Sequence, residues 1–162
     1  TDGSGLIGKG GGLYFSAANT SNLVESCTIV SNYAQDQGPG LNLEGNGLDE
    51  VWNCVVQSNE TAAASTNWYL GDAARRALIH YTCTPETMTG SGNTTADPRF
   101  ADFTAQDYRL QGGSPAVDSG AVRAWMDGAL DLDGRPRVDP LVGRVDMGAY
   151  ERRHAATLLR TR

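Results

Sequence analysis

One stretch of this chain repeats itself at a spacing of roughly 28 residues, and this repeat constrains the fold more than any other feature. Gly12-Leu13-Tyr14-Phe15 matches Gly40-Leu41-Asn42-Leu43 at this spacing. At a spacing one residue shorter, the matching pairs are Val24/Val51, Cys27/Cys54, Ile29/Val56, Ser31/Ser58 and Asn32/Asn59. Repeats of roughly 20–50 residues are typical of solenoid proteins, in which each repeat stacks on its neighbour.

The residues inside each repeat predict strands rather than helices. Leu13 and Phe15 are separated by one residue, as are Leu41 and Leu43, so each pair should point toward the core from one strand. Clusters of Gly, Asn and Ser between such runs are typical of turns. The chain has neither the leucine pattern of leucine-rich repeats nor the helical periodicity of tetratricopeptide and ankyrin repeats. We therefore expect an all-β solenoid, a parallel β-helix built of stacked rungs.

A shift in the alternation predicts a corner in each rung. After Val24 and Val51 the inward-pointing pattern slips by one residue, which places the corners near Ser26 and Asn53. A third and looser rung is expected around residues 79–83, where Ile79, Tyr81 and Cys83 alternate and should point inward.

Two kinds of side chain should stack from rung to rung. Cys27, Cys54 and Cys83 recur at nearly the spacing of the repeat, which predicts a ladder of small buried hydrophobic residues in the core. Redox or metal chemistry is the alternative, but three is an odd number and the chain has no CxxC pair. Asn32 and Asn59 occupy one rung position, where asparagine suits a tight corner, and in stacked rungs such side chains can also hydrogen-bond each other along the axis. We interpret both as structural.

The segment 60–76 departs from the repeat. It contains Ala62-Ala63-Ala64 and the run Asn67-Trp68-Tyr69-Leu70-Gly71. We expect a loop insertion, or a short helix, that bulges from the third rung. Loops on a rigid scaffold often carry binding sites, and a patch over the side of the solenoid is the alternative.

Ordered motifs fill the stretch from Asp97 to Glu151. They are Asp97-Pro98-Arg99-Phe100-Ala101-Asp102, Asp107-Tyr108-Arg109-Leu110-Gln111, Gly113-Ser114-Pro115-Ala116-Val117-Asp118-Ser119-Gly120, Asp131-Leu132-Asp133-Gly134-Arg135-Pro136-Arg137 and Val145-Asp146-Met147-Gly148-Ala149-Tyr150-Glu151. In this order they resemble the C-terminal end of bacterial surface proteins with a right-handed parallel β-helix, the choice-of-anchor Q domain. The resemblance covers about a third of the chain. It implies the right-handed form of the fold and an extracellular or cell-surface location.

Three parts follow from the repeat and the resemblance. Residues 1–96 should form parallel β-helix rungs, residues 97–151 the C-terminal rungs and a terminal cap, and residues 152–162 a basic tail. A cap is needed because the last rung of a solenoid exposes unpaired backbone and core. The first rung is exposed in the same way, so self-association through it is one alternative for a partner. No signal peptide is visible in the first residues.

One outward face is a candidate binding surface. Trp52 and Glu25 should point outward from equivalent positions on neighbouring rungs, and Tyr14 and Asn42 form a second outward pair. An exposed aromatic ring flanked by polar groups can stack on a sugar, so this face predicts weak polysaccharide binding. The alternative is that a loop covers Trp52.

Asp131 and Asp133 are candidate calcium ligands. The run Asp131-Leu132-Asp133-Gly134 resembles part of a calcium loop, but aligning Gly134 with the glycine of an EF-hand puts Ala129 and Pro140 at ligand positions. Turn and capping chemistry is the alternative for these carboxylates. No other cofactor is expected.

Composition and motifs limit the function classes. A net charge of -6 is poorly suited to a nucleic-acid backbone, and no apolar run approaches the length of a membrane span. We find no nucleophile triad, phosphate loop or recurring carboxylate pair, so no catalytic residue is assigned. The first hypothesis is a non-catalytic extracellular scaffold or adhesin that contacts polysaccharide. The alternatives are the C-terminal part of a polysaccharide lyase or glycoside hydrolase whose active site lies in missing rungs, and a self-associating assembly subunit.

Overall fold

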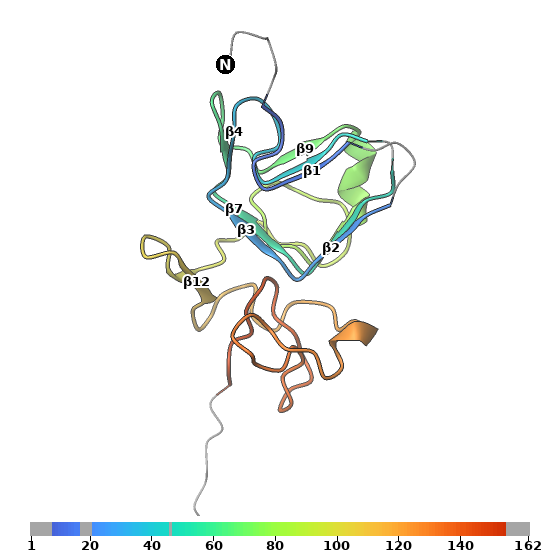
Figure 1. Ribbon diagram of the computed structural model, residues 1–162. Coiled ribbons are helices and arrows are strands. Elements are labelled where there is room, and N and C mark those ends of the chain that lie inside the picture. The colour runs from blue at the N-terminus through green and yellow to red at the C-terminus, as the bar shows by residue number, and fades with distance from the viewer. Residues whose placement is uncertain (1–7, 17–20, 46, 155–162) are drawn as a thin grey trace, which may run out of the picture.

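A computed structural model describes residues 8–16, 21–45 and 47–154 of the chain (Figure 1). Short strands are the main regular elements of this part. The strands are β1 (Leu13–Phe15), β2 (Leu23–Glu25), β3 (Thr28–Val30), β4 (Tyr33–Ala34), β5 (Leu41–Leu43), β6 (Glu50–Trp52), β7 (Val55–Gln57), β8 (Glu60–Thr61), β9 (Trp68–Leu70), β10 (Ile79–His80), β11 (Phe100–Asp102) and β12 (Asp107–Leu110). The helices of the described residues are the short 3-10 helices η1 (Ala73–Leu78) and η2 (Ala124–Met126).

The repeat places equivalent strands beside each other in parallel. Strands β1–β4 form a first pass of the chain, β5–β8 a second pass, and β9 and β10 a third. The strand orders are β1-β5-β9, β2-β6-β10, β3-β7 and β4-β8. Leu13 pairs with Leu41, and Val24 pairs with Val51. The prediction that the repeated segments form parallel strands in this register is therefore confirmed.

The expected fold class is nevertheless wrong in its main point. Among the described residues the strands form short parallel sheets and one antiparallel pair, and they do not close into a solenoid, so the structure is not a right-handed parallel β-helix. Two of the parallel sheets hold three strands each. The other two hold only two strands, because β3 and β4 have strand partners in the second pass alone. Thr94 still bridges Cys83 in parallel, but beyond it the chain leaves this arrangement, and β11 pairs with β12 in the antiparallel sense. The all-β part of the expectation fits.

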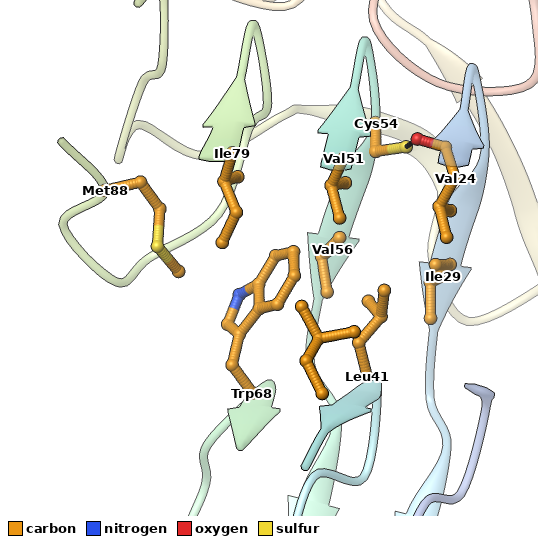
Figure 2. Packing of buried hydrophobic residues seen from close by; sticks show 10 residues of the cluster. Val24, Ile29, Leu41, Val51, Cys54, Val56, Trp68, Ile79 and Met88 are labelled. Atoms are coloured by element: carbon orange, nitrogen blue, oxygen red, sulfur yellow. Dashed lines mark hydrogen bonds between the residues drawn. The ribbon is translucent and has the colours of Figure 1, made fainter. Parts of the chain in front are cut away.

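Inward-pointing residues of the three passes make the main core. Leu41, Leu43, Val51 and Val56 are fully buried there. Figure 2 shows Val24, Val51 and Ile79 in a row across three neighbouring strands. Burying each such side chain stabilises the fold by roughly 1.5–3 kcal/mol relative to leaving it exposed. The strands that contribute to this core also carry the surface residues described below.

The corners lie where the alternation slips. Ser26 and Asn53 both have a positive φ of 53°, and Tyr81 has a φ of 47° at the same place in the third pass. The predicted corners near Ser26 and Asn53 are therefore confirmed. Tyr81 turns the corner, although the looser third repeat had suggested that it points inward.

The cysteine ladder has two members rather than three. Cys27 lies opposite Cys54, whose sulfur is 3.5 Å from the Cys27 backbone nitrogen. Cys83 instead pairs with Val55 and packs in a second core cluster with Met147. The prediction failed because the cysteine spacings are only nearly equal. The third pass pairs with the second in a register that puts Cys83 opposite Val55, the residue after Cys54. The two residues therefore lie on different faces of their strands.

The asparagine ladder is confirmed and is longer than expected. The Asn32 amide nitrogen donates to Oδ1 of Asn59 at 2.9 Å, and the Asn59 amide donates to Oδ1 of Asn67 at 2.8 Å. Asn67 continues the row to the Glu86 carboxylate, to which its amide donates at 3.0 Å. Asn67 belongs to the segment that we expected to be a loop insertion. In that segment β9 pairs with β5, and η1 follows it.

The segment 97–151 lies beside the parallel sheets. The Gly148 nitrogen donates to the Asn53 carbonyl at 2.7 Å, and the Ala149 nitrogen donates to Oγ1 of Thr28 at 3.0 Å. In Figure 1 the orange and red part of the chain accordingly lies alongside β2 and β3. This position differs from a cap on the last rung alone, because the segment contacts the first and second passes as well as Cys83 of the third.

Other expectations concern the ends of the chain. Strands β1, β2, β3 and β4 each lie at an edge of their sheet, which is where the expected self-association would occur. Of the basic tail, residues 155–162 lie outside the described residues.

No helix in the described ranges has both the length and the apolar character needed to cross a membrane.

Candidate functional site

The predicted sugar-stacking residue Trp52 is covered on its ring faces. The His80 ring stacks on the indole with centroids 4.2 Å apart, and the Arg123 guanidinium lies 4.3 Å from the indole centroid. Arg123 also pairs with Glu25 at 3.0 Å. Glu25 and His80 flank Trp52 on opposite sides in the strand order, so Arg123 covers the face that His80 leaves free. The alternative that a loop covers Trp52 is the one that the geometry supports.

The second predicted pair, Tyr14 and Asn42, does not form an open surface either. Tyr14 is exposed as expected, and its hydroxyl donates to Glu44 at 2.8 Å. Asn42 is 0% exposed, so the prediction that it contributes to an open surface is wrong. The register puts Asn42 between Tyr14 and Tyr69, and its amide lies 3.5 Å from the Gln37 carbonyl of the preceding turn. Neighbouring strands and this turn bury a side chain that alternation had placed outside.

Asp131 and Asp133 hold the C-terminal segment together. Oδ1 of Asp131 accepts from the backbone nitrogens of Asp133 and Arg135, and Oδ2 accepts from that of Glu151 at 2.7 Å. Asp133 receives two hydrogen bonds of 2.7 Å from the Arg109 guanidinium, which lowers the pKa of the Asp133 carboxyl. The turn-chemistry alternative therefore describes the contacts of both carboxylates. Within the described residues no three His, Cys, Asp or Glu side chains gather in a way that could hold a metal ion.

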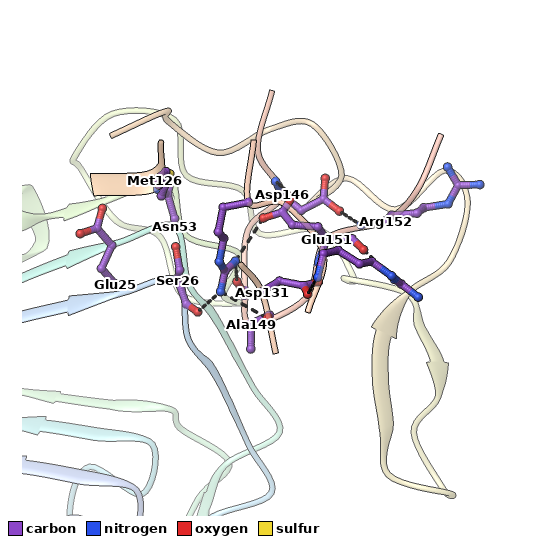
Figure 3. A network of polar contacts seen from close by, with 12 residues as sticks. Glu25, Ser26, Asn53, Met126, Asp131, Asp146, Ala149, Glu151 and Arg152 are labelled. Carbon is purple, nitrogen blue, oxygen red and sulfur yellow. Dashed lines mark hydrogen bonds and ion pairs between the residues drawn. The ribbon is translucent and has the colours of Figure 1, made fainter. Parts of the chain in front are cut away.

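A buried polar network surrounds these turns (Figure 3). The Arg137 guanidinium donates to the Ser26 carbonyl at 3.2 Å and to Glu151 at 3.1 Å, so it ties the C-terminal segment to the first pass. Burial raises the pKa of Glu151 to about 8, and it also raises the pKa of Asp146. Desolvation disfavours the charged carboxylate in both cases. The network lies inside the molecule, which suits docking of a segment and not contact with a ligand.

An open groove lies between β7 and the β11–β12 hairpin. One part of it, of about 620 Å³, runs along Gln57 and Ser58. A second part, of about 350 Å³, runs along Ser31 and Asn32, which follow β3, to Tyr33 of β4 and Glu60 of β8. Ser58 and Phe103 line both parts, so the two parts form one continuous depression. We call it the hairpin groove.

The hairpin forms the outer wall of this groove. Its turn is held by Oδ1 of Asp102, which accepts from the Ala105 nitrogen at 3.0 Å, and by the positive φ of 59° at Gln106. Phe103 stacks near Phe100 and meets Tyr108 edge-on, with ring centroids 6.2 and 5.9 Å away. This aromatic packing fixes Phe103 at the rim, where 44% of it stays exposed.

The floor and ends of the hairpin groove are polar. Tyr33 is 61% exposed at one end. The polar side chains that line the rest are Ser31, Asn32, Gln57, Ser58, Glu60, Thr95, Asp97, Arg99 and Gln111. The charged side chains among them are Glu60, Asp97 and Arg99. The Arg99 guanidinium already donates a hydrogen bond to the Gly113 carbonyl at 3.0 Å. The groove thus offers two exposed rings and many uncharged hydrogen-bonding groups.

Comparison with known proteins gives no relative. No protein family, curated protein or solved structure matches the chain. Function must therefore be inferred from the geometry of the chain itself.

Sequence reasoning missed the hairpin groove because its walls come from distant segments. Tyr33 follows Asn32 directly and could have been placed outside by alternation. Phe103 carries no such signal, since its position depends on where the hairpin docks. Arg123, which covers Trp52, likewise comes from a stretch without a recognisable pattern.

Proposed function

We propose that this chain is a non-catalytic extracellular module, a scaffold or adhesin, that binds an extended polysaccharide in the hairpin groove. The observation that carries the proposal is the placement of two exposed aromatic residues, Tyr33 and Phe103, along one groove with polar side chains between them. Aromatic faces stack on the apolar faces of sugars, and hydroxyl and amide groups bond the sugar hydroxyls. The extracellular location rests on the resemblance of residues 97–151, which stays a prediction.

An uncharged polysaccharide fits the groove better than a sulfated or uronic acid chain. Glu60 and Asp97 place negative charge at the groove, and the whole chain carries a net charge of -6. Both would repel a polyanion. Affinity should be modest, because the groove is open and few groups converge on any one sugar.

Binding without cleavage is the favoured role. Glycoside hydrolysis needs two carboxyl groups that flank one bond, one of them acting as a general acid. Glu60 and Asp97 line different parts of the groove, and Oδ1 of Asp97 accepts from the Arg99 nitrogen in a turn. We therefore assign these acids to contacts with sugar hydroxyls.

A glycan array followed by calorimetric titration of any hit tests the proposal. Tyr33→Ala and Phe103→Ala should each weaken binding about tenfold, since aromatic stacking contributes about 0.5–1.5 kcal/mol beyond area burial. Trp125→Ala is the matched control, because Trp125 is also exposed but lies outside the groove. It should bind as the wild type does.

Two outcomes would overturn the proposal. Binding that survives both groove substitutions, or that is lost equally in Trp125→Ala, would move the site elsewhere. Release of unsaturated or reducing sugar by the purified chain would show that the module is an enzyme.

A further inference from the structure

Cys27 and Cys54 form a thiol pair across adjacent parallel strands. Glu25 pairs with Trp52 on one side of them and Thr28 pairs with Val55 on the other, so the two cysteines lie opposite each other. Adjacent strands are about 4.8 Å apart, which is inside the range of roughly 4.4–6.8 Å between Cα atoms that a disulfide spans. Both thiols are free.

The two thiols differ in access. Cys54 is 0% exposed, and its thiol donates to the Trp52 carbonyl at 3.1 Å. Cys27 is partly exposed and lines an open depression of about 490 Å³ together with Phe15, Val24 and Trp125. A reagent from solution can therefore reach Cys27, whereas Cys54 is reached through Cys27.

The surroundings also make Cys27 the more acidic thiol. The Cys54 thiol hydrogen-bonds it, and the Arg137 guanidinium adds positive charge, so the pKa of Cys27 falls to about 7 although burial and Glu25 oppose this. Glu25 is itself paired with Arg123 at 3.0 Å. Burial raises the pKa of Cys54. A thiolate is the attacking species in disulfide exchange, so Cys27 attacks and Cys54 resolves.

We propose that Cys27 and Cys54 are a reversible dithiol–disulfide pair that reacts with low-molecular-weight disulfides. The Cys27 thiolate attacks one sulfur of the small disulfide, forms a mixed disulfide and releases one small thiolate. The Cys54 sulfur, after losing its proton to solvent, then attacks the Cys27 sulfur and releases the second small thiolate. The protein loses two protons and two electrons in total, and the small disulfide takes up the same number and is reduced to two thiols. Cys83 takes no part.

Oxidised glutathione and intact-protein mass spectrometry test this step. The wild type should lose two hydrogens in mass and retain no glutathione. Cys54→Ser should stop at the mixed disulfide on Cys27, and Cys27→Ser should stay unmodified. Cys83→Ser, the matched control, should behave as the wild type does. A wild type that only accumulates glutathione adducts, or a disulfide that links two chains, would overturn the proposal.

Alkylation of the reduced wild type gives a readout that needs no variant. Peptide mapping after brief treatment with iodoacetamide at neutral pH should find Cys27 labelled first, about tenfold faster than an ordinary thiol. Its labelling rate should reach half of its maximum near pH 7, the pKa of the Cys27 thiol. Equal labelling of Cys27 and Cys83 would contradict the assigned roles.

Discussion

Replacing Asn59 with alanine should destabilise the protein far more than one polar substitution usually does. Asn59 is the middle member of the asparagine ladder, and only 1% of it is exposed. Its amide nitrogen donates to the carbonyls of Ile29 and Gln57 and to Oδ1 of Asn67, at 3.0, 3.0 and 2.8 Å. Its Oδ1 accepts from both the backbone and the side-chain nitrogen of Asn32 at 2.9 Å.

The magnitude follows from the partners that the alanine would leave behind. An internal hydrogen bond contributes about 0.5–1.5 kcal/mol, and a buried polar group without a partner costs about 1–3 kcal/mol. The variant removes the side-chain donor from the Ile29 carbonyl and one of the two donors from Oδ1 of Asn67, which keeps the backbone nitrogen of residue 59 at 3.0 Å. It also frees the Asn32 nitrogens near the edge, where water can reach them. We expect Asn59→Ala to lower the free energy of unfolding by about 3–4 kcal/mol.

Urea denaturation followed by circular dichroism measures this loss as a shift of the midpoint at unchanged slope. Asn32→Ala is the matched control, because Asn32 is only partly buried and its side chain donates two hydrogen bonds, to Val30 and Asn59. It should cost about 1 kcal/mol. Equal losses for the two variants would refute the reasoning that the ladder stabilises through its buried middle.

Two further predictions concern the docking of the C-terminal segment. The folded protein raises the pKa of Glu151 to about 8 from an ordinary value of 4.5, so it holds this proton more tightly than the unfolded chain does. The Glu151 contribution to stability is therefore complete below about pH 4.5 and is lost as the pH rises to 8. Glu151→Gln should remove this decline in urea titrations carried out at a series of pH values. A pH profile of stability that is the same in the variant and the wild type would contradict the assignment. Gly148→Ala should destabilise by about 1–3 kcal/mol, because its φ is +100° and a Cβ would lie 2.7 Å from Oγ1 of Thr28. Gly128→Ala, with a φ of +71° and no atom within 4 Å, controls for backbone strain alone in thermal melts, and an equal loss there would exclude the packing argument.

The sequence by itself determined the local pairing of the first two passes. The spacing of the repeat predicted which strands lie together, and the slip after Val24 and Val51 predicted the corners. The stacked pair Asn32 and Asn59 was predicted for the same reason, since a repeat brings equivalent positions to neighbouring strands. These features depend on residues close in the repeat, so the alternation of side chains records them.

Only the tertiary structure decided how many passes stack and what covers them. The sheets stay short because the chain leaves the stack beyond Thr94, which is the last residue to bridge Cys83 in parallel. Cys83 misses Cys54 because β10 already pairs with β6 in a register that puts Cys83 opposite Val55. Arg123, from a distant segment, covers Trp52. The hairpin groove is lined by both Phe103 and Ser58, which come from segments far apart in the sequence. Such contacts depend on the packing of whole surfaces, which the periodicity of a single strand does not encode.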